Sequence, residues 1–230
     1  MEEVPALATC VRYKQVWHRI IKALKDAGYT VYWKILGCKD FYIPQSRRRL
    51  YVVGLLNPTR QFQWPEPRPD KMWCLGQLFE ADPTPVSVPT TMSTTNLRNL
   101  ETGLRLAREK GLDPACHHIV IDLEASKSRF QWRCGVSPLI TKARARRGYY
   151  ISSQGRRMCI DEMFRLFGIP PHDVPWQAAR VSKHQIRCAI GNAFPVNVMA
   201  CLISPVLFAA GVIDEIPKNK YELLGVVSLR

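Results

Sequence analysis

The chain has 230 residues, which is long enough to bury a substantial core in one or two domains. Its 33 Lys and Arg residues outnumber 19 Asp and Glu residues, and the formal net charge of +14 favours polyanionic partners, nucleic acid before an anionic membrane. No apolar run approaches the ~20 residues that span a bilayer, and the acidic start at Glu2 and Glu3 does not fit a secretory signal. We therefore expect a soluble protein without a membrane partner, nuclear if the source is eukaryotic and otherwise cytoplasmic.

The first 56 residues alternate between helix and strand patterns, as is typical of an α/β unit. Apolar residues recur at helical spacing from Val11 to Ala27, and Gly28 is a natural helix stop. Residues 29–36 are rich in β-branched and aromatic side chains, which favours a strand. The near-continuous apolar run Leu50–Leu56 is expected of a strand buried on both faces. Such an α/β unit is normally part of a larger sheet, and this chain contains too few predicted strands to complete one.

The segment before the second strand carries the most informative pattern of the chain, F-x-I-P-Q-x-R-x-R-x-Y-x-V-G. Pro44 pre-sets an extended turn. Gln45, Arg47 and Arg49 alternate, so in extended backbone they project to one side. Two guanidinium groups and an amide make a planar surface of hydrogen-bond donors for an anion or a base edge. A solvated basic loop is the alternative interpretation of the composition.

Residues 57–138 differ in character from the segments on either side. Six prolines fall between positions 65 and 89, so long regular elements are not expected there. One amphipathic helix is predicted around Asn96–Lys110, and His118–Leu123 is predicted to form a strand. We interpret the segment as a separate irregular region inserted between the sheet strands and the C-terminal part.

A basic run between residues 138 and 160 contains no acidic side chain. Glycines and tyrosines are interleaved with it, which suits phosphate contact with close backbone approach. A solvated basic surface explains the run equally well. The candidate DNA-binding residues in the run are Lys142, Arg144, Arg146, Arg147, Arg156 and Arg157.

The C-terminal part is predicted to contain two helical segments. Cys159–Gly168 has apolar residues at helical spacing and a Gly stop, and prolines follow it. Ile186–Gly211 contains an apolar helix, and Gly191 and Asn192 at its start would allow backbone to approach a small ligand.

The cysteines argue against a metal site or a disulfide framework. All eight lie at least 13 residues apart, so no C-x-x-C pair exists and reduced, mostly buried thiols are expected. Cys116, His117 and His118 form the only ligand-like cluster, but adjacent side chains point apart in regular structure. We therefore expect no bound metal.

Four short motifs follow one another in a fixed order along the chain, and together they resemble the cytosine-5 DNA methyltransferases. The chain departs from the family patterns at Glu3, which replaces the usual Asn, and at Asp161, which replaces the usual Arg. The matches are Glu2–Leu7 to E-N-V-x-x-L, Pro44–Arg49 to P-Q-x-R-x-R, Asp161–Pro170 to R-E-x-x-R-x-x-G-(F/Y)-P, and Gly191–Val196 to G-N-x-x-x-V.

The resemblance implies a fold and a set of roles. The fold is α/β, part of a doubly wound, Rossmann-like sheet that uses S-adenosylmethionine, with residues 1–56 and 139–230 in the catalytic domain and residues 57–138 as the target-recognition region. Glu2 would pair with ring nitrogen 3 of the target cytosine, and Arg47 and Arg49 would orient it. Gln45 and the basic run would contact DNA. The cofactor pocket would be closed by Gly191, Asn192 and Ala193.

The first half of the family pattern does not occur in these 230 residues. No F-x-G-x-G cofactor loop is present, and none of the eight cysteines follows a proline, as the family's nucleophile does. That thiolate adds to carbon 6 of a flipped cytosine before carbon 5 takes the methyl group. We therefore expect a fragment that is inactive alone. A non-catalytic DNA-binding module and an obligate partner of a separate N-terminal half are the alternatives.

Overall fold

A computed structural model describes residues 1–80 and 92–217, which form two compact units. Of the described residues, the first unit contains 1–42, 47–72 and 194–217. The second contains residues 43–46 and 73–193. This division differs from the expected boundaries after residues 56 and 138, because the predicted irregular region is shared between the units and residues 139–193 join its larger part. Three of the six prolines in the stretch expected to lack long regular elements, Pro83, Pro85 and Pro89, fall in residues 81–91, which lie outside the described residues.

The first unit is built on a three-stranded sheet with the order β1-β3-β2. β1 (Glu2–Glu3) and β2 (Tyr29–Gly37) both run antiparallel to β3 (Arg48–Leu56), so they are parallel to each other with β3 between them. The helices α1 (Ala6–Thr9) and α2 (Lys14–Asp26) make the crossover from β1 to β2. A short connection then returns the chain along β3, because antiparallel neighbours need no helical crossover.

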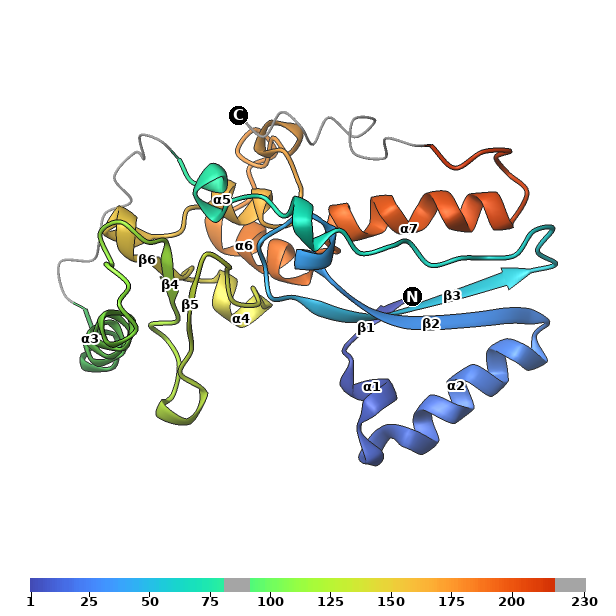
Figure 1. The fold of residues 1–230 in the computed structure, drawn as a ribbon, viewed down its shortest axis with the longest axis horizontal. Helices are drawn as coiled ribbons and strands as arrows, with labels where there is room; N and C mark the ends of the chain where they lie inside the picture. Colours follow the sequence, from blue (N-terminus) through green and yellow to red (C-terminus); the bar gives the residue numbers. More distant parts are fainter. Residues whose placement is uncertain (81–91, 218–230) are drawn as a thin grey trace. The chain divides into compact units, whose positions relative to one another are not determined.

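Helices cover both faces of this sheet (Figure 1). On one face Trp17 of α2 is buried against Leu50 and Val52 of β3. The helix α7 (Val196–Ala209) contacts β3 and lies on the opposite side of the sheet from α2. The contact between α7 and β3 joins two segments that lie about 140 residues apart in sequence.

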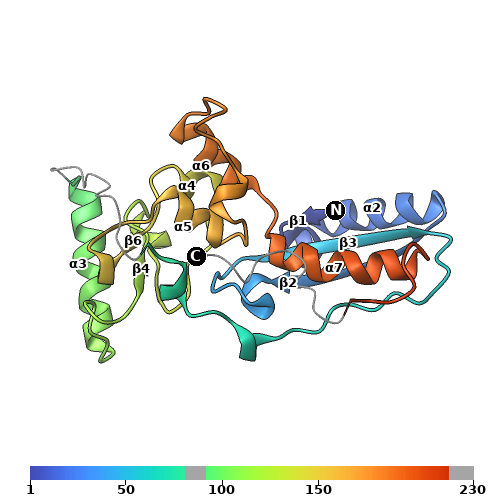
Figure 2. The ribbon, with the colours of Figure 1, turned by 90° about the horizontal axis from the view of Figure 1, so that it is seen from above.

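The second unit contains a four-stranded antiparallel sheet with the order β5-β4-β6-β7. The long helix α3 packs on β4 through Ala107, Ile121 and Leu123, and it runs beside this sheet in Figure 2. The elements of the unit are α3 (Thr94–Glu109), β4 (Ile119–Ile121), β5 (Trp132–Cys134), α4 (Lys142–Ala145), β6 (Tyr150–Ile151), β7 (Arg156–Arg157), α5 (Ile160–Arg165) and α6 (Lys183–Asn192).

The α/β class and most predicted elements are confirmed, with two differences. Every pairing between described neighbouring strands is antiparallel, so the parallel character of a doubly wound sheet is limited to the relation of β1 to β2. The predicted helical segment Ile186–Gly211 is two helices, since Ala193 and Pro195 adopt extended backbone between α6 and α7. In the described part of the chain no single helix is long and apolar enough to cross a membrane, although α6 and α7 reach that length and composition together as a bent pair.

Candidate active site

The Glu2 carboxylate is fixed at the edge of the first sheet by the pairing of β1 with β3. Glu2 is the cross-strand partner of Tyr51. The amino group of Met1 donates to the carbonyl of Val52, and the Val52 amide donates back to the Met1 carbonyl, both at 2.9 Å. These bonds hold the start of the chain on the sheet, so the position of Glu2 is set by backbone rather than by its side chain.

Glu2, Arg47 and Arg49 come together as predicted. Oε1 of Glu2 lies 3.5 Å from Nη2 of Arg47 and 3.7 Å from Nε of Arg49. The side chains are only 9%, 3% and 14% exposed, so the cluster is largely removed from water. Both arginines share one face of extended backbone because side chains alternate along a strand, and β1 brings the carboxylate to that face.

Burial and the neighbouring cations act on the Glu2 carboxyl in opposite directions. Burial raises the pKa of Glu2 above its ordinary value, and the charges of Arg47 and Arg49 oppose this rise. Burial, followed by the neighbouring Arg47, lowers the pKa of Arg49. The separations are ion-pair distances longer than strong charge-assisted hydrogen bonds. The two guanidinium charges therefore orient the Glu2 carboxyl, and the carboxyl can still form a hydrogen bond with a ligand.

Two residues of this cluster were not singled out from the sequence. Tyr51 is buried beside Glu2, and burial raises the pKa of its phenol. Cys38 is also buried, and burial raises the pKa of its thiol to about 12, so it remains protonated at neutral pH. The signal for Tyr51 was available, because it continues the alternation of Arg47 and Arg49 along the strand. No local pattern marked Cys38.

Gln45 does not lie on a surface that DNA could contact. Its side chain is fully buried, and Nε2 donates to the carbonyl of Leu166 at 3.1 Å. Its neighbourhood is further fixed by a bond from the Ser46 amide to the Ser137 carbonyl. The expected direct DNA contact is corrected to an anchoring role, because the extended turn before Arg47 passes through the core of the second unit.

The basic run divides into paired and exposed members. Nε of Arg144 lies 2.8 Å from a carboxylate oxygen of Asp122, while Glu124 is 2.7 Å from Arg157 and 3.4 Å from the more exposed Arg147. Lys142 and Arg146 are exposed. The run therefore presents fewer free cations than its composition indicates, since acidic residues 20 or more positions upstream neutralise part of it.

Arg156 is committed to a buried ion pair, which overturns its expected contact with DNA. Its guanidinium donates twice to Glu162, at 2.9 and 2.7 Å, and both side chains are almost fully buried. Glu162 also accepts from the amides of Glu80 and Cys159. Arg165 in turn lies 2.6 Å from the Glu80 carboxylate. This network fastens the chain near Glu80 to α5, so Arg156 has a structural role.

The predicted role of Gly191 is also corrected. Gly191 lies near the end of α6 rather than at the start of a helix, and a Cβ atom there would meet Lys142 N at 2.4 Å and Thr141 C at 2.6 Å. The missing side chain therefore makes room for the chain's own backbone at the start of α4, not for a ligand. Asn192 is exposed and Ala193 is half-buried in extended backbone, and neither has a contact that identifies a ligand.

Asn197 is a further residue that sequence analysis missed. It is fully buried at the start of α7, and Nδ2 donates to the carbonyls of Cys38 and Phe41. These bonds tie α7 to the turn Cys38–Phe41 that leads toward Arg47. The residue directly follows the G-N-x-x-x-V element, so extending that motif by one position would have found it.

Comparisons with known proteins agree on one family. The model of the C-5 cytosine-specific DNA methylases matches residues 1–206. The type II methyltransferase M.NgoBI of Neisseria gonorrhoeae is 30% identical over 187 residues, covering 78% of this chain and 51% of the relative. M.HaeII of Haemophilus aegyptius is 26% identical over 182 residues, with the same coverage. The chain thus spans about half the length of these curated relatives.

A solved structure shows the same fold. The methyltransferase EhMeth of Entamoeba histolytica aligns with a TM-score of 0.57 at 16% identity, covering 90% of this chain and 61% of that one.

Proposed function

The chain belongs to the C-5 cytosine-specific DNA methylase family, and on that premise we propose that it is the base-binding part of a DNA (cytosine-5) methyltransferase. The reaction would transfer a methyl group from S-adenosylmethionine to carbon 5 of cytosine in DNA. The observation that carries the proposal is the convergence of Glu2, Arg47 and Arg49, three residues from two separate motifs.

Glu2 would act on the cytosine ring. A carboxyl with a raised pKa can hold a proton toward ring nitrogen 3, and the bound form of the base is then stabilised by a charge-assisted hydrogen bond. Arg47 and Arg49 would fix the direction of that carboxyl, since two cations constrain its rotation. In this role Glu2 is the catalytic residue and the arginines position it.

The cofactor is assigned by the family rather than by a fitted site. S-adenosylmethionine supplies the methyl group when it is bound, but the three candidate residues do not form a cradle for it. The space beside Gly191 is filled by backbone, and Asn192 is exposed. The proposal therefore gives this chain the base-binding chemistry and leaves the cofactor loop to another part of the enzyme.

The nucleophile is likewise not supplied by these residues. No cysteine follows a proline, and the buried thiol beside the charged cluster, Cys38, is held protonated by burial with a pKa of about 12. We infer that these residues are inactive alone and that another part of the enzyme, in the same polypeptide or in a separate N-terminal methyltransferase half, supplies the nucleophile, with DNA as the substrate. In a eukaryotic source the enzyme would act in the nucleus.

Complementation tests this proposal. The chain is mixed with the part of the Neisseria gonorrhoeae relative that it does not match, together with labelled S-adenosylmethionine and cytosine-containing DNA. We expect methyl transfer from the mixture and none from the chain alone. Glu2→Gln should lower the rate by roughly 100-fold or more, the usual contribution of a positioned acid or base. Glu3→Gln is the matched control and should retain the rate, because Glu3 is exposed.

Each outcome separates the alternatives. Transfer by the chain alone would refute the assignment of an inactive part. Undiminished transfer by the Glu2→Gln mixture would refute the role of Glu2. Salt-dependent DNA binding without transfer in any mixture would favour the non-catalytic DNA-binding module instead.

A further inference from the structure

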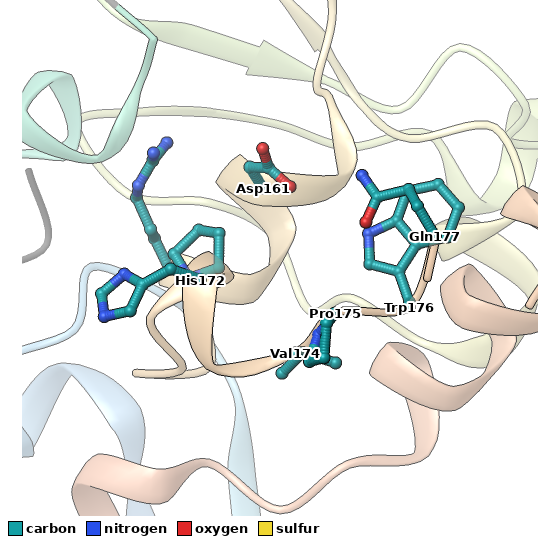
Figure 3. Close-up of a pocket in the computed structure, with 8 residues that line it drawn as sticks. Asp161, His172, Val174, Pro175, Trp176 and Gln177 are labelled. Carbon is teal, nitrogen blue, oxygen red and sulfur yellow. The ribbon is translucent and has the colours of Figure 1, made fainter. Parts of the chain in front are cut away.

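A cavity of about 420 Å³ opens beside α5 in the second unit, and none of the residues of the Glu2 cluster lines it. Its volume falls within the range of roughly 300–1,000 Å³ that is typical of small-ligand sites. The cavity is bounded by α5 on one side and by the loop that follows residue 170 on the other, as Figure 3 shows. Its lining residues are Asp161, Arg165, Pro171, His172, Val174, Pro175, Trp176 and Gln177.

The loop wall of the cavity combines apolar residues with the polar His172 and Gln177, and its backbone is internally hydrogen-bonded. The apolar surface of this wall comes from Pro171, Val174, Pro175 and Trp176. The Trp176 amide donates to the Val174 carbonyl at 2.7 Å, and the Val181 amide donates to the Trp176 carbonyl at 3.0 Å. The 3-10 turn Pro171–Asp173 begins the same loop. These bonds hold the backbone that carries the indole in place, so the wall is preformed and does not need a ligand to order it.

One carboxylate faces this wall. Asp161 lies on α5 between the side chains of His172 and Trp176 in Figure 3. It makes no hydrogen bond or close ion pair with any residue in the described ranges, while burial raises the pKa of its carboxyl. The charge of Arg165 partly opposes this rise in the pKa of Asp161. The family motif has Arg at this position.

The arginine beside Asp161 is engaged elsewhere. Nη1 of Arg165 lies 2.6 Å from the Glu80 carboxylate and donates to the Leu78 carbonyl at 3.3 Å. The charge of Arg165 is therefore largely offset by Glu80. Arg165 therefore acts on Asp161 only through its charge and makes no close ion pair with it, so the Asp161 carboxylate can still accept hydrogen bonds from a ligand.

A carboxylate next to an indole ring and prolines is suited to an organic cation. The carboxylate accepts charge-assisted hydrogen bonds, and an indole attracts a cation over its face. Apolar walls receive methylene groups. We propose that this cavity binds an aliphatic ammonium group, as carried by a lysine side chain or by a free polyamine. The site is independent of the methyl-transfer proposal, because it uses none of the residues placed in the base-binding cluster.

Binding is measured on the full chain by following the indole N–H resonance of Trp176, identified with Trp176→Phe. The probes are Nα-acetyl-lysine methylamide, spermidine, and the Nε-acetylated form of the first compound as a neutral match. The two ammonium probes should shift the resonance in a saturable way, and the neutral probe should not. Tighter binding of the lysine compound than of spermidine would identify a peptide side chain as the ligand. Tighter binding of spermidine than of the lysine compound would identify a polyamine.

Substitution at Asp161 is the second arm. Asp161→Asn should weaken binding at least about tenfold, the loss expected for a charge-assisted hydrogen bond. Asp26→Asn removes an exposed carboxylate outside this unit and should leave affinity unchanged. Equal shifts with the neutral probe, or unchanged affinity in Asp161→Asn, would overturn the proposal. If Asp161→Asn does not fold, the comparison of charged with neutral probes on the unmodified chain decides the question.

Discussion

Glu2 on β1 and Tyr51 on β3 are direct cross-strand partners, so a carboxyl group and a phenol lie side by side in the buried edge of the first sheet. The charge of Glu2 is the second cause, after burial, of the raised pKa of Tyr51. The Tyr51 hydroxyl has no hydrogen-bond partner among the described residues. This unmet donor sits next to the group that we propose binds cytosine, and it makes the role of Tyr51 testable.

Tyr51→Phe should leave stability almost unchanged or raise it. Removing a buried polar group that has no partner while keeping the ring is nearly neutral or stabilising, whereas Tyr51→Ala should cost about 3–5 kcal/mol through cavity formation. Urea denaturation of both variants measures the free energies of unfolding. A decrease above about 1.5 kcal/mol in Tyr51→Phe would mean that the hydroxyl has a partner in solution.

Glu2→Gln should change the pH dependence of stability in a defined direction. The pKa of Glu2 is raised from 4.5 in the folded chain, so the folded state binds this proton more tightly than the unfolded state. Its contribution to stability is then fully present below pH 4.5 and is lost as pH rises through the folded pKa. The free energy of unfolding of the unmodified chain, relative to Glu2→Gln, should therefore fall with rising pH.

Denaturation curves from about pH 4 to pH 8 check this sign, with Glu3→Gln as the exposed control. A relative stability that instead rises with pH would show that Arg47 and Arg49 outweigh burial at Glu2.

Cys38 should resist alkylation in the native chain. A buried thiol with a pKa of about 12 is almost entirely protonated, and the thiolate is the reactive form. Exposed Cys10 and Cys74 should react first with iodoacetamide near neutral pH, and all sites should react at comparable rates in urea. Peptide mass spectrometry follows each site over time. Fast native modification of Cys38 would indicate a thiolate stabilised by Arg47 and would make Cys38 a candidate nucleophile.

Gly191→Ala should destabilise the second unit. The new methyl group would overlap the backbone of Thr141 and Lys142, and overpacking of this kind typically costs about 1–3 kcal/mol. Asn192→Ala, at the exposed neighbouring position, should stay within about 0.5 kcal/mol of the unmodified chain. Thermal unfolding compares the two variants. Full stability of Gly191→Ala would show that the space beside Gly191 is open, as a cofactor contact requires.

The exposed members of the basic run should carry its salt dependence on DNA. Changing Lys142 and Arg146 to Ala should reduce the slope of log affinity against log salt by up to roughly 0.9 for each DNA phosphate that the variant no longer neutralises. Arg144→Ala should instead destabilise the fold, because it leaves the buried carboxylate of Asp122 unpaired. Binding titrations at several salt concentrations measure the slope. An unchanged slope in the Lys142 and Arg146 double variant would identify the run as ordinary solvated surface.

Local sequence patterns were sufficient for the family, the α/β class and most elements. Alternation along an extended strand places Arg47 and Arg49 on one side whatever the rest of the fold does. Helical spacing and glycine stops identified α2 and α3 to within a few residues. These features depend only on residues a few positions apart in sequence, so they can be predicted without knowing the tertiary structure.

Burial and ionic partners were decided by tertiary structure. Gln45 and Arg156 look like exposed hydrogen-bond donors in sequence, yet one is enclosed against Leu166 and the other is paired with Glu162. A charge becomes structural only when another segment brings a counter-charge and excludes water. The same holds for Glu2, whose role depends on β3 passing beside it. The sequence thus determined which side chains are available, and tertiary packing determined which of them remain accessible to a ligand.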